Sequence, residues 1–195
     1  AGILVESAIA LLEHYSMLHV HGLIGTYQAA MEQLPPTSLP SRMIAFIGST
    51  LGNLNPEECD RFLQKIYRAL KPGEYFLLGV DLQKPRPILE AAYNDAQGVT
   101  ADFNLNMLTH LNRRFGGDFN VAQFKHKARY NETLHQIEMH LLSTAEQTVR
   151  LDALDCSFDF NKGEMILSEI SRKFNLEQLH AQLNHHGFTI VQTWT

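Results

Sequence analysis

The sequence predicts an α/β fold built on a doubly wound parallel sheet, with a mixed α+β insertion after a strand that ends at Asp81. The first observation is a continuous apolar run at residues 43–47, typical of a strand buried on both faces, which leads into the glycine-rich turn Gly48–Asn53. The second is a helix over residues 55–70, followed by a Pro-Gly turn and another apolar strand over 75–80. The third is a change of pattern at residue 82, which reverts near residue 176.

The other elements follow from apolar spacing and turn residues. Residues 3–15 are spaced as an amphipathic helix, residues 18–24 as a short strand, and residues 27–34 as a helix that Pro35-Pro36 ends. Asn55 before Pro56 is a favourable start for helix 55–70. The later expectations are a helix over 88–115 broken near Gly98, strands over 124–130, 135–143, 147–154 and 156–160, a helix over 176–186 with Gly187 as its cap, and a strand over 188–194.

Composition narrows the class of protein. The chain has 195 residues and a net charge of −5 without clustered basic residues, which argues against a nucleic-acid partner. No apolar run reaches the roughly 20 residues that span a bilayer, so no membrane partner is expected. Cys59 and Cys156 are expected as free thiols in a reducing, cytoplasmic setting. The histidines show no third ligand at a recognisable metal spacing, so no metal is predicted.

The turn Gly48–Asn53 and the strand-end residue Asp81 mark the candidate site. Ligands of doubly wound sheets bind outside the carboxyl ends of the strands, where both features lie. Two glycines let backbone approach a ligand, and Ser49, Thr50 and Asn53 add short polar groups. The turn is neither a P-loop nor a G-x-G-x-x-G motif, which disfavours phosphate binding.

Four segments are too particular to be explained by packing alone: Phe46–Asn53, Tyr93–Asn106, Ile137–His140 and Ser168–Phe174. They resemble the histidine-specific methyltransferases of ergothioneine biosynthesis, and the resemblance covers the chain from about residue 18 onward. The turns Leu70–Gly73 and His186–Phe188 resemble those of class I methyltransferases in general. The resemblance implies a Rossmann-like class I methyltransferase fold with an inserted α+β substrate-binding domain. It also implies methyl transfer from S-adenosylmethionine to the α-amino group of L-histidine, up to the trimethylated betaine hercynine.

The same resemblance assigns roles to individual residues. Gly48 (through its backbone), Asn53 and Tyr93 match residues that hold the amino and carboxylate groups of histidine. Glu169 and Ser171 match the pair that hydrogen-bonds the imidazole. Met139 and Phe103 match residues that line the pocket for the imidazole ring. Thr26, Tyr27 and Gly48 match residues on the cofactor side. Thr26 stands where many relatives have an aspartate beside the adenine.

The expected division is a methyltransferase part at 1–83, a substrate-binding insertion at 84–173 and a return at 174–195. The acidic glycine-rich cofactor loop of the family has no counterpart here and is expected before Ala1, so residues 1–195 alone should bind S-adenosylmethionine weakly or not at all. Two alternatives remain open: a methyltransferase of this fold for another amino acid or amine, and a non-catalytic domain that kept a histidine pocket. Without the resemblance, Glu169 reads as a surface acid or as one partner of a local salt bridge.

Overall fold

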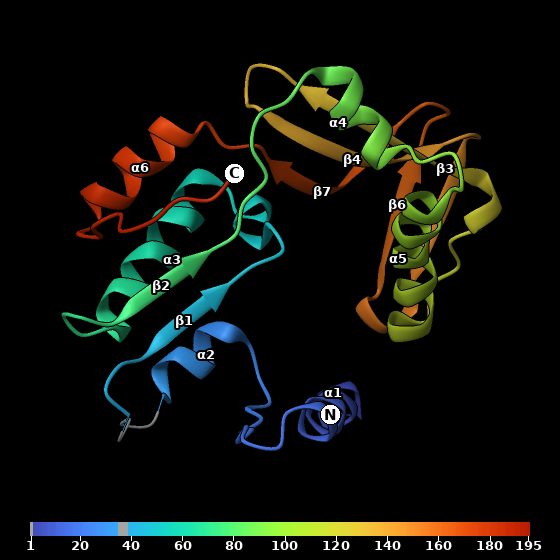
Figure 1. Cartoon of the computed structure of the whole chain (residues 1–195). Coiled ribbons are helices and arrows are strands. Elements are labelled where there is room, and N and C mark those ends of the chain that lie inside the picture. Colours follow the sequence, from blue (N-terminus) through green and yellow to red (C-terminus); the bar gives the residue numbers. More distant parts are fainter. Residues whose placement is uncertain (1, 35–38) are drawn as a thin grey trace.

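The computed structural model describes residues 2–34 and 39–195 as a mixed α/β chain in two parts (Figure 1). The first part is built on a parallel strand pair, β1 (Met43–Phe46) and β2 (Tyr75–Leu78). Helix α3 (Pro56–Ala69) connects them. Asn55 begins this helix with a capping box, because its side chain accepts from the Glu58 amide while the Glu58 carboxylate accepts from the Asn55 amide, both at 2.9 Å.

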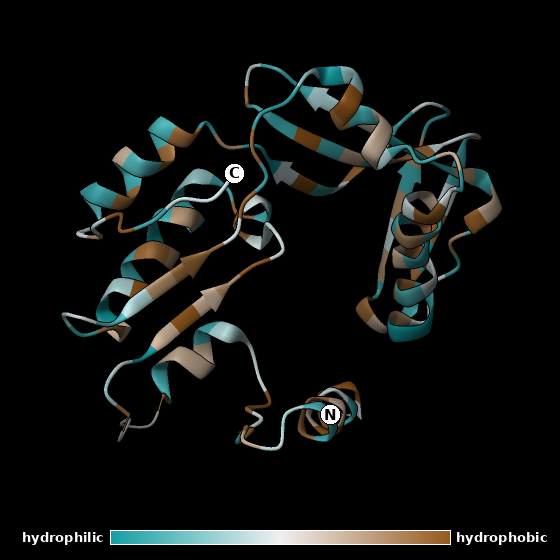
Figure 2. Cartoon of the chain, in the orientation of Figure 1, coloured by the Kyte–Doolittle hydropathy of each residue, from teal (hydrophilic) through white to brown (hydrophobic). Residues whose placement is uncertain are grey.

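The core of the first part lies between the strand pair and its helices. Helix α3 buries its apolar face, and α6 (Leu176–His185) packs against the same core near the end of the chain. Helix α2 (Tyr27–Glu32) adds an aromatic contact, since the Tyr27 ring lies 5.5 Å from Phe46 and 5.7 Å from Phe62 between centroids. Figure 2 shows the hydrophobic colouring along β1 and β2. The buried apolar residues here are Leu51, Cys59, Phe62, Leu63, Ile66, Phe174, Leu179 and Leu183.

The second part is built on an antiparallel sheet of order β3-β4-β7. Its strands are β3 (Phe124–Asn131), β4 (Gln136–Ser143) and β7 (Met165–Arg172), and β5 (Gln147–Leu151) pairs with β6 (Cys156–Phe160) as a separate ribbon. Helices α4 (Arg86–Tyr93) and α5 (Val99–Phe115) pack on the antiparallel sheet. The described residues also form three short 3-10 helices: η1 (Thr50–Asn53), η2 (Val121–Gln123) and η3 (Asp152–Leu154).

The chain passes between the two parts at one place. It leaves the first part after β2 and returns after β7, and Leu82 forms a parallel bridge with Phe174. The Phe174 amide donates to the Asp81 carbonyl at 2.9 Å, and the Gln83 amide donates to the Phe174 carbonyl at 3.0 Å. Because the outgoing and returning segments are hydrogen-bonded, the ends of β2 and β7 are held beside one another.

Several sequence expectations are confirmed. The strand–helix–strand unit has the predicted order, and the long helix is interrupted at Gly98, whose φ of +75° falls in the left-handed region. Gly187 follows α6 with a φ of +89°, as expected of a helix-ending glycine. Cys59 and Cys156 are both free thiols. The predicted stop at Pro35-Pro36 lies outside the described residues.

Two predicted strands are wrong. Residues 18–24 and 188–194 have no strand structure, although both carry the apolar pattern of one. A strand needs a neighbour for its backbone amides and carbonyls, and within residues 2–34 and 39–195 neither segment has a ladder partner. Helix α1 (Gly2–His14) forms as predicted but buries no residue. Among the described helices, none combines the length and apolar character needed to cross a membrane.

Candidate functional site

The turn after β1 is held against the end of β2 by hydrogen bonds from Ser49. The Ser49 amide donates to the Gly79 carbonyl at 3.1 Å, and its hydroxyl accepts from the Asp81 amide at 2.9 Å. Gly48 and Ser49 have φ values of +81° and +58°, a conformation that costs free energy for serine and is kept here by these two bonds. The turn therefore presents the exposed Gly48 backbone at the carboxyl ends of both strands.

Gly52 brings this turn into direct contact with the second part. A Cβ at residue 52 would lie 2.8 Å from the Arg172 carbonyl oxygen and 3.2 Å from the Arg172 nitrogen. The same position is 3.6 Å from the Ser171 hydroxyl oxygen. The absence of a side chain is thus needed for η1 to pack against the end of β7, whereas the sequence suggested that both glycines of the turn approach a ligand. Asn53 lies next in the chain and is exposed.

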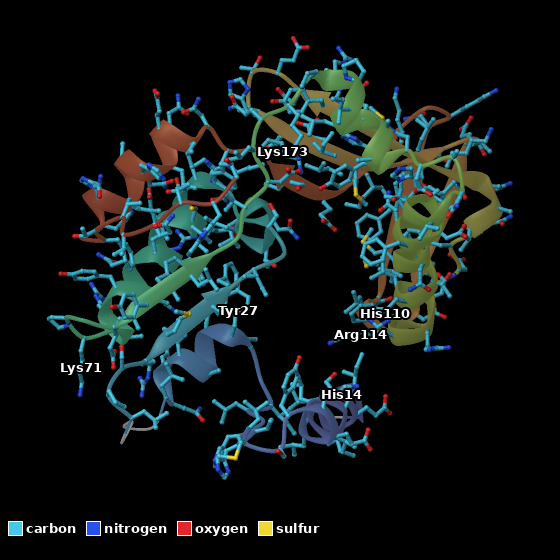
Figure 3. The ribbon with its side chains drawn as sticks, viewed as in Figure 1. His14, Tyr27, Lys71, His110, Arg114 and Lys173 are labelled. Atoms are coloured by element: carbon cyan, nitrogen blue, oxygen red, sulfur yellow. The ribbon has the colours of Figure 1, made fainter. Side chains whose placement is uncertain are left out.

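A buried lysine, Lys173 (labelled in Figure 3), contacts side chains from the segment after β2, from α4 and from β7. The Lys173 side chain is 0% exposed, and its Nζ lies 3.1 Å from an Asp81 carboxylate oxygen. The same ammonium donates to the Tyr93 hydroxyl and to the Ser171 hydroxyl, each at 2.9 Å. Tyr93 and Ser171 are themselves hydrogen-bonded at 2.9 Å. We call Asp81, Tyr93, Ser171 and Lys173 the lysine clasp.

The clasp contains one cation, Lys173, and one anion, Asp81, and Lys84 adds a second cation beside Asp81. Burial acts to raise the pKa of Asp81, but hydrogen bonds and positive charges from Lys84 and Lys173 outweigh this effect and leave the pKa below its usual value. The Lys173 ammonium also lies 4.7 Å from the centroid of the Tyr93 ring, a cation–π distance. Each of the three N–H donors of the ammonium can therefore reach an oxygen acceptor, as a buried charge requires.

Glu169 and Met139 lie beside the clasp on the same face of the antiparallel sheet. Met139 of β4 pairs with Glu169 of β7, and Ile137 pairs with Ser171, so these side chains share one face. The pairing shifts after Met139, where β7 carries an extra residue, Ser168, whose hydroxyl donates to the Met139 carbonyl at 2.9 Å. Met139 is 3% exposed.

The Glu169 carboxylate stands out because it is half-buried and has no partner in the part of the chain that the structure describes. Burial raises the pKa of Glu169, and the positive charge of Lys173 only partly opposes that rise. Within the described residues, no hydrogen bond or ion pair satisfies this carboxylate, and Lys173 forms its ion pair with Asp81 instead. The salt bridge considered from sequence is therefore not what holds Glu169. The arrangement leaves an acceptor available to a ligand.

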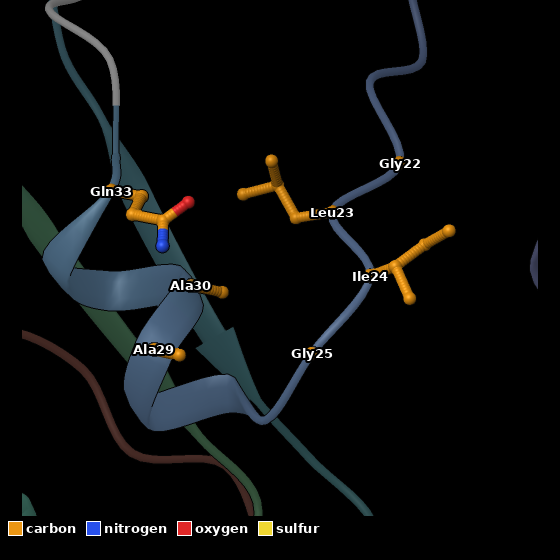
Figure 4. Close-up of a pocket in the computed structure, with 7 residues that line it drawn as sticks. All are labelled: Gly22, Leu23, Ile24, Gly25, Ala29, Ala30 and Gln33. Atoms are coloured by element: carbon orange, nitrogen blue, oxygen red, sulfur yellow. The ribbon is translucent and has the colours of Figure 1, made fainter.

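The remaining predicted residues lie apart from this cluster. Phe103 of α5 is 67% exposed, so it does not line a closed ring pocket here. The Thr26 hydroxyl caps α2 by accepting from the Ala29 amide at 3.2 Å, and Tyr27 is 38% exposed beside β1. A pocket of about 260 Å³ lies between the segment Gly22–Gly25 and α2, lined by Leu23, Ile24, Ala29, Ala30 and Gln33 (Figure 4). It adjoins the predicted cofactor side and contains none of the predicted histidine-binding residues.

Sequence reasoning missed Lys173 and Ser49. Lys173 follows Ser171 by two residues and Glu169 by four, and the period-two alternation of a strand would have placed all three on one face. Ser49 lay inside the singled-out turn, but its left-handed backbone and its bond to the Asp81 amide have no signal in a single sequence.

The whole chain, residues 1–195, matches a family model described as "Histidine-specific methyltransferase, SAM-dependent". It is 37% identical over 195 residues to proteins named "Histidine N-alpha-methyltransferase" from Mycobacterium tuberculosis (strain CDC 1551 / Oshkosh) and Mycolicibacterium smegmatis, covering 100% of this chain and 60% of each relative. It is 32% identical over 207 residues to "Ergothioneine biosynthesis protein 1" of Neurospora crassa, covering 98% of this chain and 22% of that protein. The chain thus spans less than two thirds of the length of these relatives, and it belongs to the family of histidine-specific, SAM-dependent methyltransferases.

Proposed function

We propose that the chain selects the substrate in an enzyme that transfers methyl groups from S-adenosylmethionine to the α-amino nitrogen of L-histidine. The reaction would proceed to the trimethylated betaine hercynine, within ergothioneine biosynthesis. The observation that carries the proposal is the half-buried Glu169 carboxylate, which has no partner among the described residues and lies beside the Ser171 hydroxyl and the Met139 side chain. The names of the relatives from the two mycobacteria support methylation at the α-amine of histidine, and the name of the Neurospora crassa relative supports the pathway.

The ring subsite matches the chemistry of imidazole. A neutral imidazole offers one N–H donor and one nitrogen acceptor on opposite sides of the ring. Glu169 would accept from the N–H, and Ser171 would bond to the other nitrogen. Met139 would pack against the ring through its polarizable thioether. A side chain without ring nitrogens would leave Glu169 buried and unpaired, a mismatch that can reject a ligand by roughly 10⁴-fold.

The head of the amino acid would be held from the first part of the chain. Gly48 offers exposed backbone at the end of β1, and Asn53 offers an amide that both donates and accepts. Tyr93 reaches the same junction from α4 through its bond to Ser171. The imidazole ring and the amino and carboxylate groups of histidine would thus be bound by residues from both parts of the chain. The α-amine of histidine must be neutral to attack the methyl group. We assign no general base that would remove its proton.

The residues present fit one side of an S-adenosylmethionine pocket. Tyr27 presents a partly exposed ring beside Phe46 at the end of β1, and the Thr26 hydroxyl keeps its hydrogen for donation while it caps α2. Together with the Gly48 backbone, these groups would suit the adenosyl end. When bound, the cofactor supplies an electrophilic methyl group on a sulfonium. The task of this chain's residues is to align the amine with that methyl group.

We propose that the fold follows the same division of labour. Residues 1–83 and 174–195 would belong to a Rossmann-like class I methyltransferase sheet, and residues 84–173 would be an inserted substrate-binding domain. The bridge between Leu82 and Phe174 supports this division. An inserted domain leaves the surrounding domain and returns to it at neighbouring points, and these two residues lie where the chain does so.

The test is a product analysis with the full-length protein. The protein is incubated with S-adenosylmethionine carrying a labelled methyl group and with a panel of amino acids, and the products are fragmented by mass spectrometry. We expect up to three labelled methyl groups on the α-amine of histidine. Glu169→Ala should abolish most turnover, while Glu146→Gln, at an exposed site without a role in the cluster, should not. Methylation of a ring nitrogen, or a stronger preference for another amino acid, would overturn the proposal. Histidine binding without turnover would favour a non-catalytic domain.

A further inference from the structure

The hydrogen-bond directions in the lysine clasp are restricted by the number of hydrogens available. An ammonium donates three hydrogen bonds and accepts none. Lys173 has an oxygen for each of them, on Asp81, Tyr93 and Ser171. Both hydroxyl oxygens must therefore act as acceptors toward Lys173, and neither can donate its own hydrogen to it.

The bond between the two hydroxyls uses one further hydrogen. Tyr93 and Ser171 contribute one hydroxyl hydrogen each, and their mutual bond at 2.9 Å consumes one of the two. One hydroxyl hydrogen is left over and must find an acceptor outside the clasp. When Tyr93 donates to Ser171, the Ser171 oxygen accepts from both Lys173 and Tyr93, and its own hydrogen is free to point at a ligand.

The Glu169 carboxylate beside Ser171 restricts which hydrogen-bonding groups that ligand must carry. Glu169 lies two residues before Ser171 in β7 and is unpaired among the described residues, so a ligand there should present a hydrogen-bond donor to it. When Ser171 accepts from both Lys173 and Tyr93, the ligand should present a hydrogen-bond acceptor to the Ser171 hydroxyl. The pair thus recognises a ring with a donor and an acceptor in fixed places, and it distinguishes such a ring from one that carries only an N–H.

We infer that Lys173 is a positioning residue for this subsite: by occupying the acceptor sites of Tyr93 and Ser171, it makes Ser171 the hydrogen-bond donor to the acceptor nitrogen of the substrate ring. This inference rests on the proposed function. Lys173 acts through Ser171 and does not itself contact the ring.

The test measures ring discrimination by calorimetric titration of the full-length protein with saturating S-adenosylhomocysteine. The ligands are L-histidine and the two pyrrolylalanine isomers, which place an N–H at either ring-nitrogen position and lack the acceptor nitrogen. We expect the wild-type protein to prefer histidine over the better isomer by about tenfold or more, the range of one lost hydrogen bond with a buried group left unpaired. In Lys173→Met that preference should fall below about threefold, because Ser171 is then free to donate to Tyr93.

Companion variants separate positioning from structural support. Ser171→Ala should lose the preference to the same extent, and the double variant with Lys173→Met should lose no more, as expected of residues that act through one bond. Lys173→Arg, which keeps donors and charge, should restore part of the preference. Lys162→Met, the same substitution at an exposed turn, should leave it unchanged. Lys84 remains to pair with Asp81 in Lys173→Met, so that carboxylate keeps a partner.

Tyr93→Phe tests the same inference without disturbing the buried charge. With Lys173 still holding its oxygen, Ser171 keeps its hydrogen for the ring, so the preference for histidine should persist although both ligands bind more weakly. Loss of the preference in Tyr93→Phe, or equal weakening of all ligands in Lys173→Met with the preference intact, overturns the role of Lys173 alone. If the wild-type protein binds histidine no better than the pyrrole isomers, the proposed function fails as well.

Discussion

Replacement of Glu169 by glutamine should move stability and histidine binding in opposite directions. The Glu169 carboxylate is partly desolvated and has no partner among the described residues, so its charge weakens the fold of the free protein. Glutamine keeps the shape and an acceptor oxygen but carries no charge. We expect Glu169→Gln to be slightly more stable than the wild type at pH 7, and the gain to stay small because the side chain is only half-buried.

The pH dependence of that gain follows from the direction of the pKa shift. The pKa of Glu169 is raised in the folded protein, so the folded state holds its proton longer than the unfolded state does. Wild-type stability therefore falls as the pH rises from the ordinary pKa of glutamate, about 4.3, through the raised value. The difference between Glu169→Gln and the wild type should be absent below about pH 4 and reach its full size once Glu169 is ionised in the folded state.

Binding should respond in the opposite sense. A hydrogen bond to a charged acceptor contributes about 1.5–3 kcal/mol, against about 1 kcal/mol for a neutral one. Loss of the charge in Glu169→Gln therefore costs about 1 kcal/mol, or about fivefold in the Kd for histidine, and loss of the acceptor in Glu169→Ala costs about 10- to 150-fold. Urea unfolding at several pH values and calorimetric titration with histidine measure both effects, with Glu146→Gln as the matched control. A Glu169→Gln protein that is less stable at pH 7 than the wild type, or that binds histidine equally well, refutes the reasoning.

Two further predictions concern the elements that position the site. Asn55→Ala removes one half of the capping box of α3, and it should lower the free energy of unfolding by about 1 kcal/mol in urea titration, whereas Asn55→Ser should cost little. An unchanged midpoint for Asn55→Ala would show that the cap bond with Glu58 contributes nothing. Gly52→Ala should cost about 1–3 kcal/mol and weaken histidine binding, since its Cβ would lie 2.8 Å from the Arg172 carbonyl and push the turn off β7. Gly2→Ala, whose new Cβ would meet no atom nearer than the Glu6 carboxylate at 4.0 Å, should leave both measurements unchanged, and a harmless Gly52→Ala would contradict the close approach.

The strand–helix–strand unit could be predicted because its signals are local. An unbroken apolar run, an Asn-Pro helix start and a Pro-Gly turn each depend on neighbours within a few residues. The break at Gly98 was predictable for the same reason, since a left-handed backbone favours glycine. The pairings of β3, β4 and β7 were not, because residues far apart in the sequence form them and the bulge at Ser168 depends on where those strands meet.

The two wrong strands show the limit of apolar patterning. Residues 18–24 and 188–194 have the right composition, but a strand exists only where another backbone supplies its hydrogen bonds. For Phe103 the assignment to the ring pocket stays a prediction, and the structure shows only that its side chain is exposed on α5. Apolar patterning thus indicates which structure a segment can form, whereas the tertiary structure decides whether a neighbouring backbone is there to pair with it.

The sequence by itself determined the family, and it singled out Glu169, Ser171 and Met139 for the proposed ring subsite because they lie in distinctive segments that local order preserves. Only the tertiary structure decided which of these groups is paired. Lys173 could have neutralised Glu169, four residues earlier, but the fold brings Asp81 to 3.1 Å of its ammonium and Tyr93 to 2.9 Å. A buried ammonium has only three donors, and the chain's return beside β2 fills them. The Glu169 carboxylate is therefore left without a partner among the described residues.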